Sequence, residues 1–302
     1  MKLRVGTRGS ALALIQTRLV TTALEGLGAH SEVVILRPLG DRDKVSPMRA
    51  LGAGAFVKDL ELALADGRVD LAVSSAKDLH SETTTGLAFA AFLPREDPLD
   101  VLIARQPTTL RTLEAAATVG TSSPRRRAFL LAARPDLNVQ EIRGNVDTRL
   151  RKLESGEIAA LVLAAAGLAR LGLSDRATER LDPAVMLPAI GQGAIVVQAR
   201  ADAYDLQSLL SQIDHRPTRQ AVDAERAFVA ALGGNCDTAI AALGTVDADR
   251  LVLEGAVLDP DGARIVRDRA HGPTAGAAAL GRALAEKLLA QGAGRLLVGA
   301  AR

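Results

Sequence analysis

The chain alternates short, mostly apolar segments with longer segments whose apolar residues recur at helical spacing. The short runs are typical of strands, the longer ones of amphipathic helices, and their alternation predicts α/β layers. In the first part of the chain we expect strands over 3–6, 31–39, 69–74 and 87–93, and helices over 11–27 and 55–65. Proline, glycine and charged residues between Arg37 and Ala50 favour a mobile loop there.

A second series of strands and helices follows residues 94–100, where two prolines and three acidic residues indicate a hinge. Ser123 and Pro124 are typical of a helix start, so we expect a helix from there to Ala133. The glycines of 187–193 suit a crossover, after which a strand over 194–200 is expected to return to the first sheet. The other expected elements are strands over 100–105, 117–120 and 138–143, a helix over 146–153, and a strand running into a helix over 159–167.

The last part of the chain predicts a separate, smaller unit. A helix from Arg216 to Leu232 ends at two glycines, and three strands over 239–245, 251–258 and 264–269 precede a helix from Thr274. We therefore predict an α/β protein with two α/β domains, a cleft between them and a smaller C-terminal α+β domain. The predicted boundaries are 1–95 with 194–213 for domain 1, 96–193 for domain 2 and 214–302 for domain 3.

Composition and charge narrow the classes of partner. The net charge is only +2, but the segment from Gly120 to Lys152 contains eight basic residues and only three acidic ones. Arginine outnumbers lysine 31 to 6, and a guanidinium binds a carboxylate or phosphate through two hydrogen bonds. Aromatic residues make up 2% of the chain, too few for the stacking surfaces that bind single-stranded nucleic acid. We expect a polyanionic small molecule as ligand and no nucleic acid.

Other classes of protein are also disfavoured. The longest apolar run, 158–169, is shorter than the roughly 20 residues that cross a bilayer, so no membrane partner is expected. Four scattered histidines and one cysteine give no metal-ligand spacing, so we expect no metal. A single cysteine and no N-terminal targeting pattern favour a cytoplasmic protein, which we expect to be a monomer.

Three polar turns follow expected strands: GTRGS at 6–10, GTSSPRRR at 120–127 and IRGNVDTRL at 142–150. Each turn combines free backbone N–H groups with arginine, which is a typical anion site. Serine and threonine at these positions could instead only cap helices. The presence of arginine in all three turns favours anion binding, and both interpretations remain open for each turn.

Two further positions could carry chemistry. Lys77 and Asp78 follow a buried strand, and alternation along an extended chain would point them to opposite sides. If Asp78 faces the arginine-rich cleft it stays ionised, which suits stabilisation of a transient cation; a solvated charge pair is the alternative. Cys236 is the only sulfur nucleophile, although a lone cysteine is more often a small buried apolar residue. The sequence has no phosphate loop, dinucleotide-binding fingerprint or nucleophile elbow.

The chain resembles the porphobilinogen deaminase (hydroxymethylbilane synthase) family over nearly its whole length. The matching segments, in order, are GTRGSALALIQT, FVKDLE, the KD of SSAKDLH, REDP, GTSSPRRR, RPDL, IRGNVDTRLRKL, LAAAGLARLGL, LPAIGQGA, ERAF and GGNC. The resemblance implies two periplasmic-binding-protein-like α/β domains and a transferase that joins four porphobilinogen molecules head to tail with loss of ammonia. It also implies a dipyrromethane cofactor held by a thioether to Cys236, and Asp78 as the catalytic carboxylate.

The resemblance further implies a set of residues that bind the carboxylates of cofactor and substrate. They are Arg8, Ser10, Lys77, Thr121, Ser122, Ser123, Arg125, Arg126, Arg143, Asn145, Arg149 and Arg170. Gln16 and Lys58 match family residues near the active-site loop. The chain departs from the family pattern at Ser74, at the Leu79–His80 stretch, at Ala53 and in the cysteine loop GGNCDTAI.

Two other functions fit the same residues. One is a non-catalytic anion-binding protein of the same two-domain architecture, resembling periplasmic solute-binding proteins. The other is a degenerate relative that binds pyrroles without turnover, a reading that Ala53 and Ser74 motivate. The mass of the intact protein separates the enzyme from the simple binding protein, and consumption of porphobilinogen tests the degenerate relative.

Overall fold

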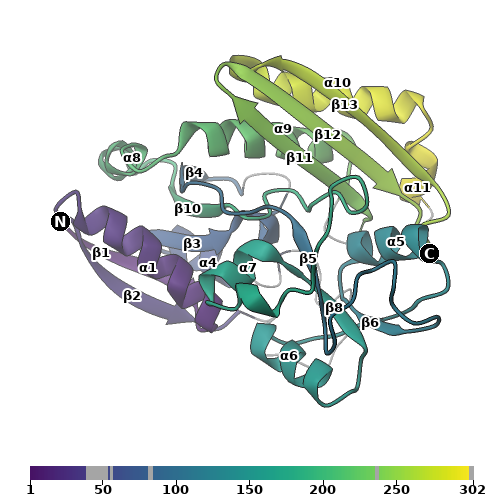
Figure 1. Cartoon of the computed structure of the whole chain (residues 1–302). Coiled ribbons are helices and arrows are strands. Elements are labelled where there is room, and N and C mark those ends of the chain that lie inside the picture. The colour runs from purple at the N-terminus through teal and green to yellow at the C-terminus, as the bar shows by residue number, and fades with distance from the viewer. Residues whose placement is uncertain (39–53, 55–56, 81–83, 235–237, 299–302) are drawn as a thin grey trace.

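The computed structural model describes residues 1–38, 54, 57–80, 84–234 and 238–298. Most of the loop expected between Arg37 and Ala50 lies outside these residues, as do Ala53 and Cys236. Within them the chain forms three sheets with helices packed against them, and the C-terminal sheet lies across the other two (Figure 1). The predicted α/β class with a smaller α+β unit is therefore confirmed.

The first sheet has the strand order β2-β1-β3-β10-β4. Its strands are β1 (Lys2–Arg8), β2 (His30–Leu36), β3 (Leu71–Ser75), β4 (Leu87–Phe92) and β10 (Ile195–Arg200). Strand β1 runs parallel to β2 and β3, whereas β10 runs antiparallel to β3 and β4. The expected return of the chain to this sheet is confirmed by β10. The associated helices are α1 (Ala11–Glu25), α4 (Lys58–Ala65) and α8 (Tyr204–Ser211).

The second sheet repeats this topology, in the order β7-β6-β8-β5-β9. Its strands are β5 (Asp100–Ala104), β6 (Thr118–Gly120), β7 (Asn138–Gln140), β8 (Ala160–Ala164) and β9 (Glu179–Arg180). Strand β6 is parallel to β7 and β8, and β5 is antiparallel to β8, just as β10 is to β3. The helices are α5 (Pro124–Ala133), α6 (Val146–Glu154) and α7 (Ala165–Arg170), followed by the short 3-10 turn η2 (Ser174–Arg176).

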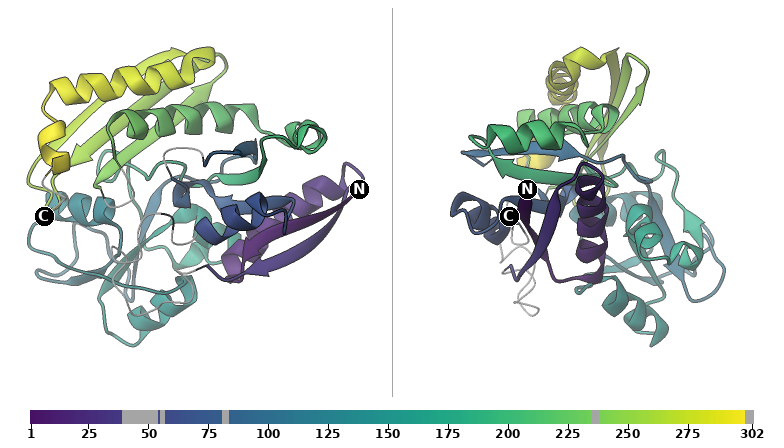
Figure 2. Two further views of the ribbon diagram at one scale, coloured as in Figure 1. Left: turned by 180° about the vertical axis from the view of Figure 1, so that it is seen from behind. Right: turned by 90° about the vertical axis from the view of Figure 1, so that its left-hand side faces the viewer.

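The third sheet is antiparallel, in the order β11-β12-β13, and helices α9 and α10 pack together against it (Figure 2). Its elements are α9 (Arg216–Ala231), β11 (Ile240–Asp247), β12 (Arg250–Leu258), β13 (Ile265–Pro273), η3 (Thr274–Gly276), α10 (Ala277–Ala290) and α11 (Gly294–Val298). A side chain at Gly281 would overlap the Ala224 carbonyl oxygen, so this glycine permits the close approach of α10 to α9. The strands of the three sheets fall within the three predicted domain ranges, while the boundaries themselves stay predictions.

The structure corrects several expected elements. The strand expected over 31–39 ends at Leu36, two residues before Pro38, which has no N–H for a sheet ladder. The helix expected from Thr274 begins with the 3-10 turn η3 and becomes α-helical only at Ala277. Helices α8 and α11 and strand β9 were not expected; β9 is two residues long, too short for a periodic pattern. No helix of the described chain is long and apolar enough to cross a bilayer.

The C-terminal domain packs against both other domains. Phe129 and Leu130 of α5 share one apolar cluster with Ala241 and Leu258 of the third sheet. Val222 of α9 belongs to another cluster, with Phe92 at the end of β4. Burial of such side chains stabilises the fold by about 1.5–3 kcal/mol each, so these contacts bind the domains to one another.

A buried ion pair lies where the domains meet. The carboxylate of Glu225, on α9, has no exposed surface and lies 2.5 Å from Nη1 of Arg95. Arg95 belongs to the first crossover between the domains, residues 93–99 between β4 and β5. The Glu225 carboxylate also accepts hydrogen bonds from the backbone N–H groups of Gly191, at 2.6 Å, and Gly244, at 2.7 Å. Gly191 lies in the second crossover, residues 181–194 between β9 and β10, and Gly244 lies in β11. One carboxylate therefore joins both crossovers to the C-terminal domain.

Removing this carboxylate tests its importance for stability. Glu225→Ala leaves the Arg95 guanidinium buried without its partner and two N–H groups unbonded, and we expect a loss of about 3–5 kcal/mol in the free energy of unfolding. Urea unfolding measures it. The control is Glu32→Ala, which removes the exposed ion pair with Lys2 and should change stability far less. Equal losses in the two variants would contradict this role of Glu225.

Candidate active site

A cavity of about 240 Å³ lies where the three domains meet. The first domain contributes the turn that follows β3, the second contributes the start of α5, and the third contributes residues of α9 and β11. Its charged lining residues include Lys77, Asp78, Arg125 and Arg126. The cleft expected at the ends of the strands is therefore present, and it contains the expected acid together with expected cations.

The turn that carries Lys77 and Asp78 differs from expectation. Ala76–Asp78 forms the 3-10 turn η1, not a continuation of the extended strand. The prediction that the two side chains point to opposite sides was wrong, because strand alternation ends at Ser75 and both residues line the same cavity. Oδ2 of Asp78 lies 3.9 Å from Nη1 of Arg8, at the end of β1, so the acid does face arginine.

The first polar turn and helix α1 lie next to the turn that carries Asp78. Ser10 accepts a hydrogen bond from the Ala13 N–H at 3.3 Å and so caps α1. Gln16, on the buried side of α1, donates from Nε2 to the Ser75 hydroxyl at 2.8 Å, directly before the acid-bearing turn. Lys58 is exposed at the first position of α4, and its side chain makes no hydrogen bond to the cavity residues of the described chain. Of the two residues placed near the active-site loop, Gln16 thus contacts the site.

Lys77 has an unusual titration. Its side chain is only partly exposed, and the loss of hydration around its ammonium group lowers its pKa to about 8. The positive charge of Arg126 lowers the pKa further, while Asp78 and Asp100 oppose the shift. A lysine in this position loses its charge within a mildly alkaline range instead of far above it.

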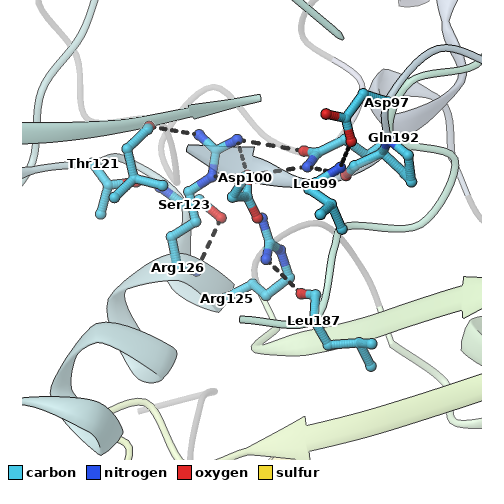
Figure 3. A network of polar contacts seen from close by, with 11 residues as sticks. Asp97, Leu99, Asp100, Thr121, Ser123, Arg125, Arg126, Leu187 and Gln192 are labelled. Carbon is cyan, nitrogen blue, oxygen red and sulfur yellow. Dashed lines mark hydrogen bonds and ion pairs between the residues drawn. The ribbon is translucent and has the colours of Figure 1, made fainter. Parts of the chain in front are cut away.

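A buried acid holds the two arginines at the start of α5 (Figure 3). Asp100, at the start of β5, is fully buried and accepts a hydrogen bond from Nη2 of Arg125 at 2.7 Å and from Nε of Arg126 at 2.9 Å. Burial alone would raise the pKa of Asp100, but the two arginines outweigh it and hold the pKa below its ordinary value. Gln192 donates to the same carboxylate at 3.0 Å.

Asp100 and Gln192 were missed by the sequence analysis. Asp100 is an acid that opens an otherwise apolar strand, and such a residue is rarely buried unless it is paired. Gln192 stands between two glycines in the segment LPAIGQGA, which was interpreted only as a crossover. The acid at the start of an apolar strand and the glutamine between two glycines are both visible in the sequence. The sequence does not show which residues they bind.

Arg125 has an unused hydrogen-bond donor. Its Nη1 donates to the Leu187 carbonyl at 2.6 Å and its Nη2 to Asp100, but its Nε is buried and has no hydrogen-bond partner among the described residues. Burial lowers the pKa of Arg125 from its ordinary value, against the pull of Asp100. A buried donor without a partner is costly unless a ligand supplies an acceptor.

The second polar turn, at residues 121–123, is tightly bonded. Ser123 accepts from the Arg126 N–H at 3.4 Å and caps α5, and Thr121 accepts from the Ser123 N–H at 3.2 Å. Ser122 donates to the Ile142 carbonyl at 2.8 Å, which joins this turn to the third one. Capping is therefore a real role of Ser10 and Ser123.

The third polar turn brings Arg149 to the site. Its Nε donates to the Gly144 carbonyl at 2.8 Å and its Nη2 to Ser122 at 3.4 Å. Burial lowers the pKa of Arg149 to about 10, and the positive charges of Arg126 and Arg143 lower it further, while Asp78 opposes them. Lys77, Arg126, Arg143 and Arg149 therefore lie close enough to influence one another or Asp78, and we call these four residues the cationic cluster around Asp78.

The remaining predicted residues lie further out. Arg143 of this cluster is half-buried, and Asn145 is exposed as the first residue before α6, without a side-chain cap bond. Arg170, on α7, donates from Nη2 to the Gly193 carbonyl at 2.6 Å, in the second crossover, and burial lowers its pKa. Within the described residues, no group of three or more His, Cys, Asp or Glu side chains is arranged to hold a metal ion.

Comparison with known proteins identifies a family over nearly the whole chain. Residues 3–208 match the family model "Porphobilinogen deaminase, dipyromethane cofactor binding domain", and residues 219–290 match "Porphobilinogen deaminase, C-terminal domain". The chain is 47% identical over 299 residues to the porphobilinogen deaminase of Pelotomaculum thermopropionicum, covering 98% of this chain and 96% of that protein. It is also 47% identical over 300 residues to that of Moorella thermoacetica, with the same coverage.

Solved structures show a more distant likeness. The chain is similar to the VFT2 domain of BvgS from Bordetella pertussis, with 18% identity, a TM-score of 0.42 and coverage of 70% of this chain and 86% of that one. The two family models and the relatives over nearly the full length show that the chain belongs to the porphobilinogen deaminase family, transferases with a dipyrromethane cofactor.

Proposed function

We propose that the chain is a hydroxymethylbilane synthase of tetrapyrrole biosynthesis, which joins four porphobilinogen molecules head to tail with loss of ammonia. The observation that supports this most is the placement of one carboxylate, Asp78, in a cavity whose other charged residues include Lys77, Arg125 and Arg126. Each porphobilinogen carries two carboxylates, so a site for several units needs many cations. A single acid among them can act on the one part of the substrate that becomes positive.

In this proposal Asp78 is the catalytic residue. Loss of ammonia from the aminomethyl group of porphobilinogen leaves a delocalised cation, and a fixed carboxylate stabilises that charge as it develops. Arg8 and the 3-10 turn fix the position of Asp78 before the substrate arrives. The same carboxylate can accept a hydrogen bond from the pyrrole N–H, which assists the departure of ammonia because it stabilises the positive charge that this step leaves on the ring.

The cationic cluster fits a ligand with several carboxylates. In the part of the chain that the structure describes, the buried Nε of Arg125 has no partner, and Lys77, Arg126 and Arg149 share the cluster around the acid. We propose that these residues, with Arg8, Arg143, Arg170 and the hydroxyl groups of 121–123, hold the acetate and propionate groups of cofactor and substrate. The dipyrromethane supplies a nucleophilic pyrrole carbon when it is bound.

Three parts of the proposal stay predictions. Cys236, the expected thioether attachment, lies outside the described residues, although α9 leads towards it and Thr238 after it lines the cavity. A cytoplasmic location and a monomeric state are expectations for this chain. Porphobilinogen as substrate rests on the family to which the chain belongs.

The cofactor attachment has a direct test. The purified chain, produced in a host that makes porphobilinogen, should exceed its sequence mass by two linked pyrrole units, and peptide analysis should place the addition on Cys236. Cys236→Ser should lack the addition, because a serine hydroxyl does not form the thioether. A native chain at its bare mass even after incubation with porphobilinogen, or a fully loaded Cys236→Ser chain, would overturn the attachment.

The role of Asp78 predicts a large loss of rate. Asp78→Asn keeps the shape of the side chain but removes its charge, and we expect kcat for porphobilinogen consumption to fall about 10²–10³-fold. Asp66→Asn, at the exposed end of α4, is the control and should leave kcat unchanged. Turnover by Asp78→Asn within a few-fold of the native chain is incompatible with this role.

Lys77 predicts a dependence on pH. Its folded pKa of about 8 means that it is charged below this pH and neutral above it, so binding of substrate carboxylates should weaken as the pH rises through 8. We expect kcat/KM to fall by about tenfold over this transition, because the neutral amine no longer makes a charge-assisted hydrogen bond to a substrate carboxylate. Lys77→Arg keeps its charge over the same range, so its profile should lack this transition. Identical profiles for the two proteins would show that Lys77 does not contribute.

A further inference from the structure

We infer that Gln192 is a positioning residue that sets the separation between the catalytic acid of the first domain and the arginine pair of the second. This inference rests on the proposed function and gives Gln192, a buried neighbour of the arginine pair, a role in it. Its basis is the tripeptide Gly191–Gln192–Gly193 in the second crossover, which meets all three domains.

The acid and the arginine pair do not hold each other directly. Within the described residues, no hydrogen bond or ion pair joins the side chain of Lys77 or Asp78 to Arg125 or Arg126. The arginines are bonded instead to Asp100, Leu187 and the Val162 carbonyl, all in the second domain or its crossover. The separation of the two halves of the site must therefore be set through another part of the chain.

Gly191 lies against the acid-bearing turn. It has a φ of +67°, and a Cβ added to it would lie 2.8 Å from Cβ of Ala76 and 3.2 Å from the backbone nitrogen of Lys77. The crossover backbone thus packs directly on the turn that presents Asp78. The backbone N–H of Gly191 is held in turn by Glu225, at 2.6 Å.

The next residue reaches the arginine pair. Gln192 is 1% exposed, and its Nε2 donates to the Asp100 carboxylate at 3.0 Å and to the Pro98 carbonyl, in the first crossover, at 2.7 Å (Figure 3). Its Oε1 accepts from Nη2 of Arg126 at 3.4 Å, and its own carbonyl accepts from Nε of Arg95 at 2.8 Å. One side chain therefore aligns the Asp100–Arg126 pair with both crossovers.

Gly191 contacts the turn that carries Asp78, and Gln192 contacts Asp100 and Arg126. Because the two residues are neighbours in the chain, they fix the distance between the acid and the arginine pair. Bound substrate must meet Asp78 at its reacting carbon and the arginines at its carboxylates at the same time. A displacement of about 1 Å between such groups can lower a rate about 10²-fold. Loss of the Gln192 side chain should therefore lower kcat more than it weakens substrate binding.

The first test compares Gln192→Leu with the native chain and with Gln207→Leu. Gln207 also donates from Nε2 to two carbonyls, of Arg200 and Ala201, but lies in the first domain away from the cavity. We expect Gln192→Leu to lower kcat at least tenfold with KM within threefold of the native value, while intact mass shows a loaded cofactor. Gln207→Leu should shift the urea midpoint without lowering kcat. Native kcat, or a raised KM with native kcat, would overturn the inference.

The second test uses Gln192→Glu and covers the case in which the leucine variant fails to fold or to load. The introduced carboxyl lies beside Asp100: when protonated it can donate to Pro98 or Asp100, and when ionised it repels Asp100 and donates nothing. Its activity relative to the native chain should therefore rise several-fold as the pH falls from about 9 to about 6, and its urea midpoint should rise relative to that of the native chain over the same range. A ratio of activities that does not change with pH would overturn the inference.

A native chain that consumes no porphobilinogen would instead refute the proposed function.

Discussion

The structure depends on one buried carboxylate, that of Glu225, which holds three separate parts of the chain at one point. Arg95 comes from the first crossover, Gly191 from the second and Gly244 from the C-terminal sheet. A buried charge is costly unless its hydrogen bonds are complete, and this carboxylate has an arginine and two backbone donors. Because those donors come from different domains, satisfying the charge also fixes how the domains meet.

The same principle operates in the site. Asp100 neutralises part of the charge of Arg125 and Arg126 and gives their guanidinium groups a fixed direction. Lys77 and Arg149 are partly exposed cations with a lowered pKa, and their positive charge favours a ligand that brings negative charge. The second crossover carries both arrangements, since Gly191 binds Glu225 and Gln192 binds Asp100. Domain arrangement and site geometry are therefore set by one short segment.

Much of the fold follows from periodicity. Ser123 and Pro124 begin α5, Gly233 follows the end of α9, and residues 195–200 return to the first sheet as the sequence predicted. These features arise from local preferences, which the sequence displays directly. The turn at Lys77 and Asp78 was wrongly predicted because a 3-10 turn and a strand continuation carry the same short polar pattern. Tertiary contacts hold the turn, among them the packing of Gly191 against Ala76.

The sequence by itself determined the kind of chemistry: one acid, one thiol and an excess of arginine in polar turns, in the order of a known family. The tertiary structure decided which charges meet. Asp100 precedes its arginines by 25 and 26 residues and Gln192 by 92, and pairing over such separations depends on the sheet register and the crossovers. The local sequence pattern carries no information on that register, because the register is set by side chains that come into contact only after the domains have packed.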